Sequence, residues 1–75
     1  MGLNVIQEKI LHVLREGSTN RFGGKEKGVK LEEIAERVGY PIEKVNANLM
    51  VLEIMRKVRQ FPHRFFKIEE EEKTW

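Results

Sequence analysis

The spacing of apolar residues along the chain predicts three helices. In Asn4–Glu16 they form one stripe, which is typical of an amphipathic helix: Ile6, Ile10, Val13 and Leu14. Leu31–Val38 shows the same helical spacing at Ile34, Ala35 and Val38. A third helix is predicted over roughly Ile42–Met55, where apolar residues fall at i, i+4 and i+7: Val45, Leu49 and Leu52.

Residues 31–52 form the most informative segment, because the last two predicted helices follow each other so closely that they read as a helix-turn-helix. Gly39 can end the first of them in a left-handed conformation, and Tyr40-Pro41 then reverses the chain. Ala35 provides the small side chain that two tightly crossed helices need where they touch. Such a motif presents its second helix outward, as a reader of the DNA major groove does.

The last part of the domain predicts a β-hairpin, with strands Arg56–Phe61 and Phe65–Ile68. A three-residue turn at Pro62–Arg64 pairs Phe61 with Phe65, and the pairing of residues continues along the two strands. One face then suits a core and carries Val58, Gln60, Phe66 and Ile68. The other face is basic, with two aromatic residues, and carries Lys57, Arg59, Phe61, Phe65 and Lys67.

Gly28–Lys30 can add a short edge strand, so the predicted order is helix, strand, helix, helix, strand, strand. This order predicts an α+β fold of the winged helix-turn-helix class, with one domain at residues 1–68 and an acidic tail at 69–75. The chain resembles small winged-helix DNA-binding proteins of the archaeal or bacterial regulator type over about residues 3–68. The resemblance is carried by the basic hairpin, or wing, and by Ile34-Ala35, Val38-Gly39, Val45, Leu49 and Leu52. One departure is Arg56, which stands where such regulators often have glycine after the recognition helix.

Charge is unevenly distributed, although the net charge of the 75 residues is only +2. The hairpin segment 56–68 has five Lys or Arg residues and no acid, whereas segment 31–55 has two against five acids. Phosphate is the commonest target of such a basic block. Abundant Lys and Glu without Cys also suggests a heat-loving source.

Several classes of protein are not expected from this sequence. It contains no cysteine and two histidines, so we expect neither a metal site nor a cofactor. No catalytic combination of residues stands out, and we predict that the protein is not an enzyme. No apolar run approaches the ~20 residues that span a bilayer, and no signal peptide is evident, so we expect a cytoplasmic protein.

The outward side of the third helix is the first candidate DNA surface. Asn can pair with adenine edges, Ala can touch a thymine methyl, and Lys can reach phosphate. The candidate residues are Glu43, Lys44, Asn46, Ala47, Asn48 and Met50. The alternative is an ordinary solvated or partner-covered face, since Glu43 would oppose phosphate.

The wing is the second candidate, as a salt-dependent grip on phosphates. Its candidate residues are Arg56, Lys57, Arg59, His63, Arg64 and Lys67. The alternative is a charged hairpin that merely prevents edge pairing. The glycine-rich loop 18–28 offers further backbone contacts through Arg21, Lys25 and Lys27, or is simply a polar loop.

These patterns together predict a transcriptional regulator that binds double-stranded DNA. The third helix is also apolar on nearly every side toward its end, which indicates a homodimer. We expect no membrane partner and no small-molecule effector. The alternative function is a winged-helix interaction module, as a subunit or dimerisation domain of a transcription, replication or chromosome complex.

Overall fold

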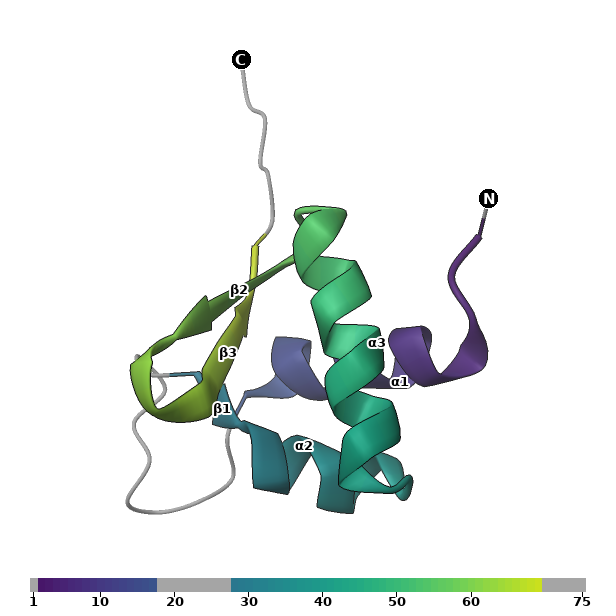
Figure 1. Ribbon diagram of the computed structural model, residues 1–75, viewed down its shortest axis with the longest axis horizontal. Coiled ribbons are helices and arrows are strands. Elements are labelled where there is room, and N and C mark those ends of the chain that lie inside the picture. Colours follow the sequence, from purple (N-terminus) through teal and green to yellow (C-terminus); the bar gives the residue numbers. More distant parts are fainter. Residues whose placement is uncertain (1, 18–27, 70–75) are drawn as a thin grey trace.

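Three helices pack against a small antiparallel sheet in the computed structural model, which describes residues 2–17 and 28–69 (Figure 1). The α+β fold class is confirmed, and the arrangement is compatible with a winged helix-turn-helix. The elements are α1 (Val5–Glu16), β1 (Val29–Lys30), α2 (Leu31–Val38), α3 (Ile42–Ile54), β2 (Val58–Phe61) and β3 (Phe65–Ile68).

Local capping explains where α1 begins and ends. Asn4 Oδ1 accepts a hydrogen bond of 2.7 Å from the Gln7 backbone N–H, and Gln7 Oε1 accepts one of 3.2 Å from the Asn4 backbone N–H. This reciprocal pair is a capping box, which satisfies two backbone donors at the start of the helix. At the other end Gly17 adopts a φ of 85° and donates to the Val13 carbonyl.

The turn between α2 and α3 has the predicted chemistry. Gly39 adopts the left-handed conformation, with a φ of 77°, and its N–H donates to the Ala35 carbonyl at 3.0 Å. Pro41 directly precedes α3, where its fixed φ suits a helix start. In Figure 1, α3 rises across the end of α2.

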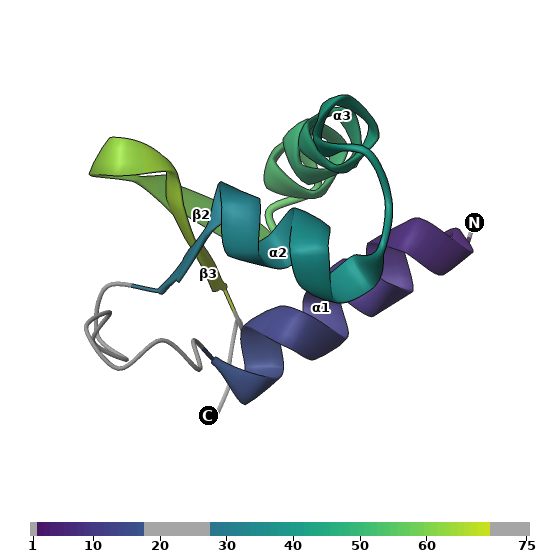
Figure 2. The same cartoon turned by 90° about the horizontal axis from the view of Figure 1, so that it is seen from below.

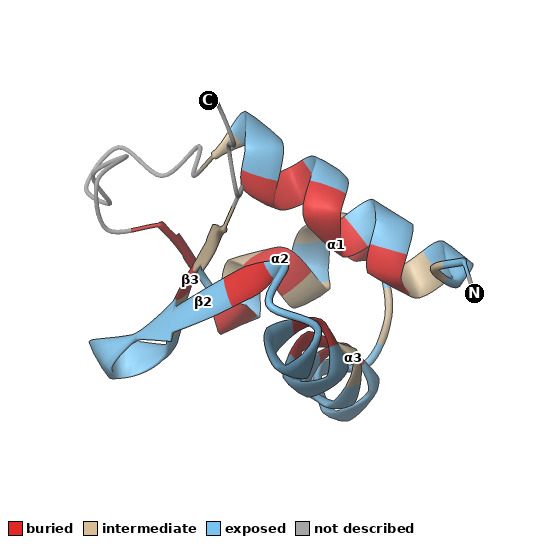
Figure 3. Cartoon of the chain, turned by 90° about the horizontal axis from the view of Figure 1, so that it is seen from above, coloured by how far each residue is buried: buried red, intermediate tan, exposed pale blue. Residues whose placement is uncertain are grey.

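The core lies between the three helices and the inner face of the sheet. Val45, Leu49 and Leu52, the predicted inward residues of α3, are completely buried. They pack with residues from the other helices and the sheet: Ile10, Leu11, Val13, Leu14, Val29, Leu31, Ile34, Val38, Val58 and Phe66. Burying each large side chain of this kind stabilises the fold by about 1.5–3 kcal/mol before entropic costs. In Figure 3 the buried residues mark the inner side of each helix.

β3 is the central strand of the sheet, in the order β1-β3-β2. The hairpin pairs Phe61 with Phe65 and Val58 with Ile68, which confirms the three-residue turn and its register. β1 pairs Val29 with Phe66, so the short edge strand is also confirmed.

The prediction for the core-facing side of the hairpin was wrong at one position. Val58 and Phe66 are buried, but Gln60 is exposed. After Val58 the strand β2 extends beyond the helices. Its remaining residues are exposed because no helix packs against them.

α3 ends at Ile54 and β2 begins at Val58, slightly inside the predicted limits. The residue that replaces the expected glycine, Arg56, adopts a left-handed φ of 63°. Its N–H donates to the Glu53 carbonyl, and the Lys57 N–H donates to the Leu52 carbonyl, each at 2.9 Å. This is a Schellman cap, built with arginine where glycine is usual.

Candidate nucleic-acid interface

A groove separates α3 from the hairpin on the side of the molecule opposite α1. Figure 2 shows α3 and the hairpin tip on one side and α1 on the other, and Figure 3 agrees. The groove has a volume of about 500 Å³. It is lined by the start of α2, one side of α3 and the hairpin: Leu31, Ile42, Glu43, Asn46, Met50, Glu53, Gln60, Arg64 and Phe66. We call it the α3–hairpin groove.

Three of the predicted recognition residues line this groove: Glu43, Asn46 and Met50. All three are exposed. Among the described residues, neither the Glu43 carboxylate nor the Asn46 amide makes a hydrogen bond or ion pair. Their donors and acceptors are therefore available to a molecule that enters the groove.

The other predicted recognition residues lie elsewhere on α3. Lys44 and Ala47 are exposed but do not line the groove. Asn48 is turned toward α1, where its Oδ1 accepts hydrogen bonds of 3.1 Å from Asn4 Nδ2 and Gln7 Nε2. Its own amide donates to the Lys44 carbonyl at 2.9 Å. Asn48 thus joins two helices and is not part of the groove.

The six wing residues are divided among three places. Arg64 lines the groove next to the exposed tip residue His63, and its guanidinium is 3.8 Å from the Glu32 carboxylate of α2. Arg59 and Lys67 pair with each other across the strands, in register between the groove-lining Gln60–Phe66 pair and the Val58–Ile68 pair. Side chains alternate across a sheet, so these two cations occupy the face that points away from the groove.

That outer face carries its own interactions. Lys67 Nζ lies 5.9 Å from the centre of the Phe61 ring, and Lys30 Nζ lies 5.8 Å from that of Phe65. Arg59 is 3.8 Å from the Glu69 carboxylate. All are surface contacts, and an exposed ion pair contributes only about 0–1 kcal/mol. These cations therefore remain accessible to an anion.

The last two wing residues, Arg56 and Lys57, border a different hollow. It lies at the far end of α3, and Arg15 of α1 and Met55 also line it.

Three non-glycine residues in the described part of the chain have a positive φ: Arg56, His63 and Arg64. Such conformations cost of order 1–3 kcal/mol each and often mark functional surfaces. Two of the three form the hairpin tip.

The C-terminal half of α3 exposes apolar side chains. Ile54 is 79% exposed, Met50 55% and Val51 43%, and Met55, directly after the helix, is 42% exposed. Each exposes a large apolar area to solvent, and the hairpin does not cover them. A cluster of this kind on a helix commonly marks a contact with another molecule.

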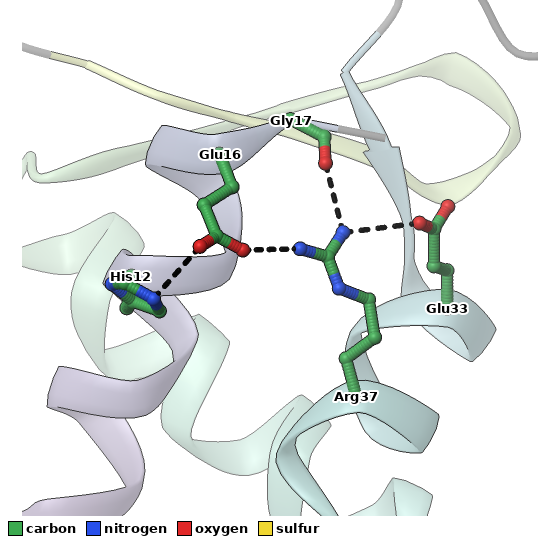
Figure 4. A network of polar contacts seen from close by, with 5 residues as sticks. All are labelled: His12, Glu16, Gly17, Glu33 and Arg37. Atoms are coloured by element: carbon green, nitrogen blue, oxygen red, sulfur yellow. Dashed lines mark hydrogen bonds and ion pairs between the residues drawn. The ribbon is translucent and has the colours of Figure 1, made fainter. Parts of the chain in front are cut away.

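A polar cluster between α1 and α2 was missed in the sequence analysis (Figure 4). The Arg37 guanidinium donates to the Gly17 carbonyl at 2.8 Å, to Glu16 at 2.7 Å and to Glu33 at 3.1 Å. Glu16 also contacts His12 Nε2 at 3.0 Å. The i,i+4 spacings from His12 to Glu16 and from Glu33 to Arg37 were the available signals.

Three predicted backbone contacts, Arg21, Lys25 and Lys27, lie outside the described residues, as does all of the acidic tail except Glu69. In the described ranges, no helix is long and apolar enough to cross a membrane. No group of three or more potential metal ligands comes together in the same ranges. No family model, no curated protein and no solved structure matches the chain.

Proposed function

We propose that this chain is a winged helix-turn-helix protein that binds double-stranded DNA, in the cytoplasm, to control transcription. The observation that carries the proposal is the α3–hairpin groove, where the unpaired polar side chains of α3 face Arg64 of the hairpin tip. Base readout needs free donors and acceptors on a helix, and positioning needs a cation beside it. The groove supplies both within one surface.

Each part of this surface has a role in the proposal. α3 enters the major groove with Asn46 nearest the bases and Ala47 close enough to touch a thymine methyl. Arg64 and His63 lie on a flanking phosphate. Arg59 and Lys67 lie on the outer face, so they attract DNA through their long-range electrostatic field more than through direct contact with phosphates.

Fluorescence anisotropy with random-sequence duplex DNA across a salt series tests the proposal. The affinity should fall as salt rises, because phosphate binding releases counterions. Arg64→Ala should weaken binding to every sequence by about tenfold and lower the salt slope by about one. Arg59→Ala should have a smaller effect.

Lys9→Ala is the matched control, because Lys9 is an exposed cation on α1, on the opposite side of the molecule. It should change affinity less than threefold. Duplex binding that is absent at low salt, or equally weakened by Lys9→Ala and Arg64→Ala, would contradict the proposal.

We also propose a homodimer that closes over the exposed apolar end of α3. Ile54 lies eight residues beyond Asn46, or about 12 Å along the helix, so the two surfaces can be used together. A two-fold dimer would present two recognition helices to half-sites one DNA turn apart. Light scattering should give twice the chain mass, and Ile54→Glu should give the monomer mass.

The exposed apolar end of α3 also favours a second candidate function, a protein-interaction module. The acids along α2 and α3 support it, because they oppose DNA over much of this surface. Heparin retention separates the two functions. A dimer that elutes from heparin at low salt and does not bind the random duplex would favour the interaction module.

A further inference from the structure

The groove is lined by two acids, Glu43 and Glu53, which a DNA-binding surface would be expected to avoid. Glu43 lies in the first turn of α3, exposed and without an ion pair among the described residues. A carboxylate facing phosphates would weaken binding. If the groove binds DNA, as proposed above, the position of Glu43 must be compatible with some part of the duplex.

Base edges in the major groove offer such a place. Guanine O6 and N7 and thymine O4 are acceptors, so they repel a carboxylate, whereas cytosine presents the N4 amino group as a donor. Glu and Asp side chains accept hydrogen bonds from this group. Adenine also presents an amino group, at N6, but its neighbouring N7 acceptor repels a carboxylate. A glutamate on the reading side of a recognition helix therefore favours cytosine.

The neighbouring groove residue gives the second base. Asn46 follows Glu43 at i+3 and lines the same groove, so the two Cβ atoms are about 5–6 Å apart on one side of α3. The base pairs of a duplex are stacked about 3.4 Å apart. Two side chains at this separation reach bases one or two steps apart. The amide of Asn46 suits adenine, which offers N6 as donor and N7 as acceptor.

We propose that Glu43 and Asn46 determine sequence specificity, with Glu43 reading a cytosine one or two base pairs from an adenine read by Asn46. This inference rests on the proposed DNA binding. Arg64, on the opposite side of the groove, holds a phosphate and so fixes the register of α3 on the bases.

Selection from a randomised duplex library, followed by anisotropy on the enriched sequence, tests this assignment. The wild type should enrich cytosine and adenine at two positions no more than two steps apart. Replacing that cytosine–guanine pair by thymine–adenine should weaken wild-type binding about tenfold. Glu43→Gln should lose less than threefold on the same replacement, and should bind random duplex about threefold more tightly because a repulsive charge is gone.

Glu36→Gln provides the matched control. It removes the same charge from an exposed residue of α2 that does not line the groove. It should keep the full tenfold preference for cytosine. Glu43→Ala serves as a second variant and should also lose the preference.

The outcomes distinguish this inference from the proposed function. If the duplex binds with the expected salt dependence but Glu43→Gln retains the cytosine preference, the specificity assignment is wrong and DNA binding stands. The same conclusion follows if the wild type enriches no cytosine. If no duplex binds at low salt, both the assignment and the proposed function are wrong.

Discussion

Two polar regions of the molecule, the α1–α2 cluster and the α3–hairpin groove, differ in how their side chains are used. In the cluster, Arg37 is 20% exposed and reaches three oxygen acceptors, on Glu16, Glu33 and Gly17. In the groove, Glu43 and Asn46 reach none among the described residues. A polar group that is paired internally contributes to stability, and one that faces a groove unpaired is available for binding. The contrast therefore separates residues that hold the fold from candidates for recognition.

Arg37→Ala should have the largest effect on stability. It removes three charge-assisted or backbone hydrogen bonds and leaves the mostly buried Glu33 carboxylate without this partner, so it should cost about 2 kcal/mol. For a domain of this size that corresponds to a fall in Tm of about 8–16 °C in a thermal unfolding experiment. Arg15→Ala, an exposed arginine on the same helix as Glu16, should stay within about 0.5 kcal/mol. Equal losses from the two substitutions would show that the cluster does not hold α1 to α2.

The two asparagines of α3 test the contrast within a single helix. Asn48→Ala should destabilise the protein by about 1–1.5 kcal/mol, because it leaves the amides of Asn4 and the buried Gln7 without their acceptor. Asn46→Ala should change stability by less than about 0.5 kcal/mol. Urea unfolding measures both.

DNA binding should show the reverse order for the same pair. Asn46→Ala should weaken binding to the selected duplex by about tenfold, since a bidentate base contact is lost. Asn48→Ala should bind normally at temperatures where it is folded. If Asn48→Ala lost binding while Asn46→Ala kept it, the recognition surface would have to lie on the α1 side of α3.

The same contrast explains what the sequence could predict. Helix limits depend on local periodicity and caps such as Asn4 and Gly39, and these were correct to within one residue. The hairpin register was predictable because a three-residue turn sets Val58 opposite Ile68, whereas a two-residue turn would oppose an apolar residue with Lys67.

Contacts between distant segments were not predictable from the sequence. Asn48 meets a partner 41 residues away, and Arg37 meets one 21 residues away. Periodicity placed both side chains on the right helix but could not say which neighbouring element they would touch. The alternation of side chains placed Arg59 and Lys67 on the outer face of the hairpin, but it could not show that Arg64 of the tip lines the α3–hairpin groove.

The smallest expected effect concerns Arg56, where α3 joins the hairpin. Arg56→Gly should stabilise the protein by about 0.5–1 kcal/mol, because glycine tolerates a φ of 63° without the steric cost that arginine meets, and this gain exceeds the added freedom of the unfolded chain. The urea midpoint should rise with an unchanged m-value. Lys57→Gly is the control and should lower the midpoint, because Lys57 has no positive φ to relieve.

DNA binding by the Arg56→Gly variant then tests how far the recognition surface extends along α3. Arg56 borders the hollow shared with Arg15, away from the α3–hairpin groove, so removing its charge should leave the salt slope unchanged. A slope that falls by about one would mean that a phosphate reaches the far end of α3. In that case the duplex would cover the apolar residues there as well, and the dimer would need another surface.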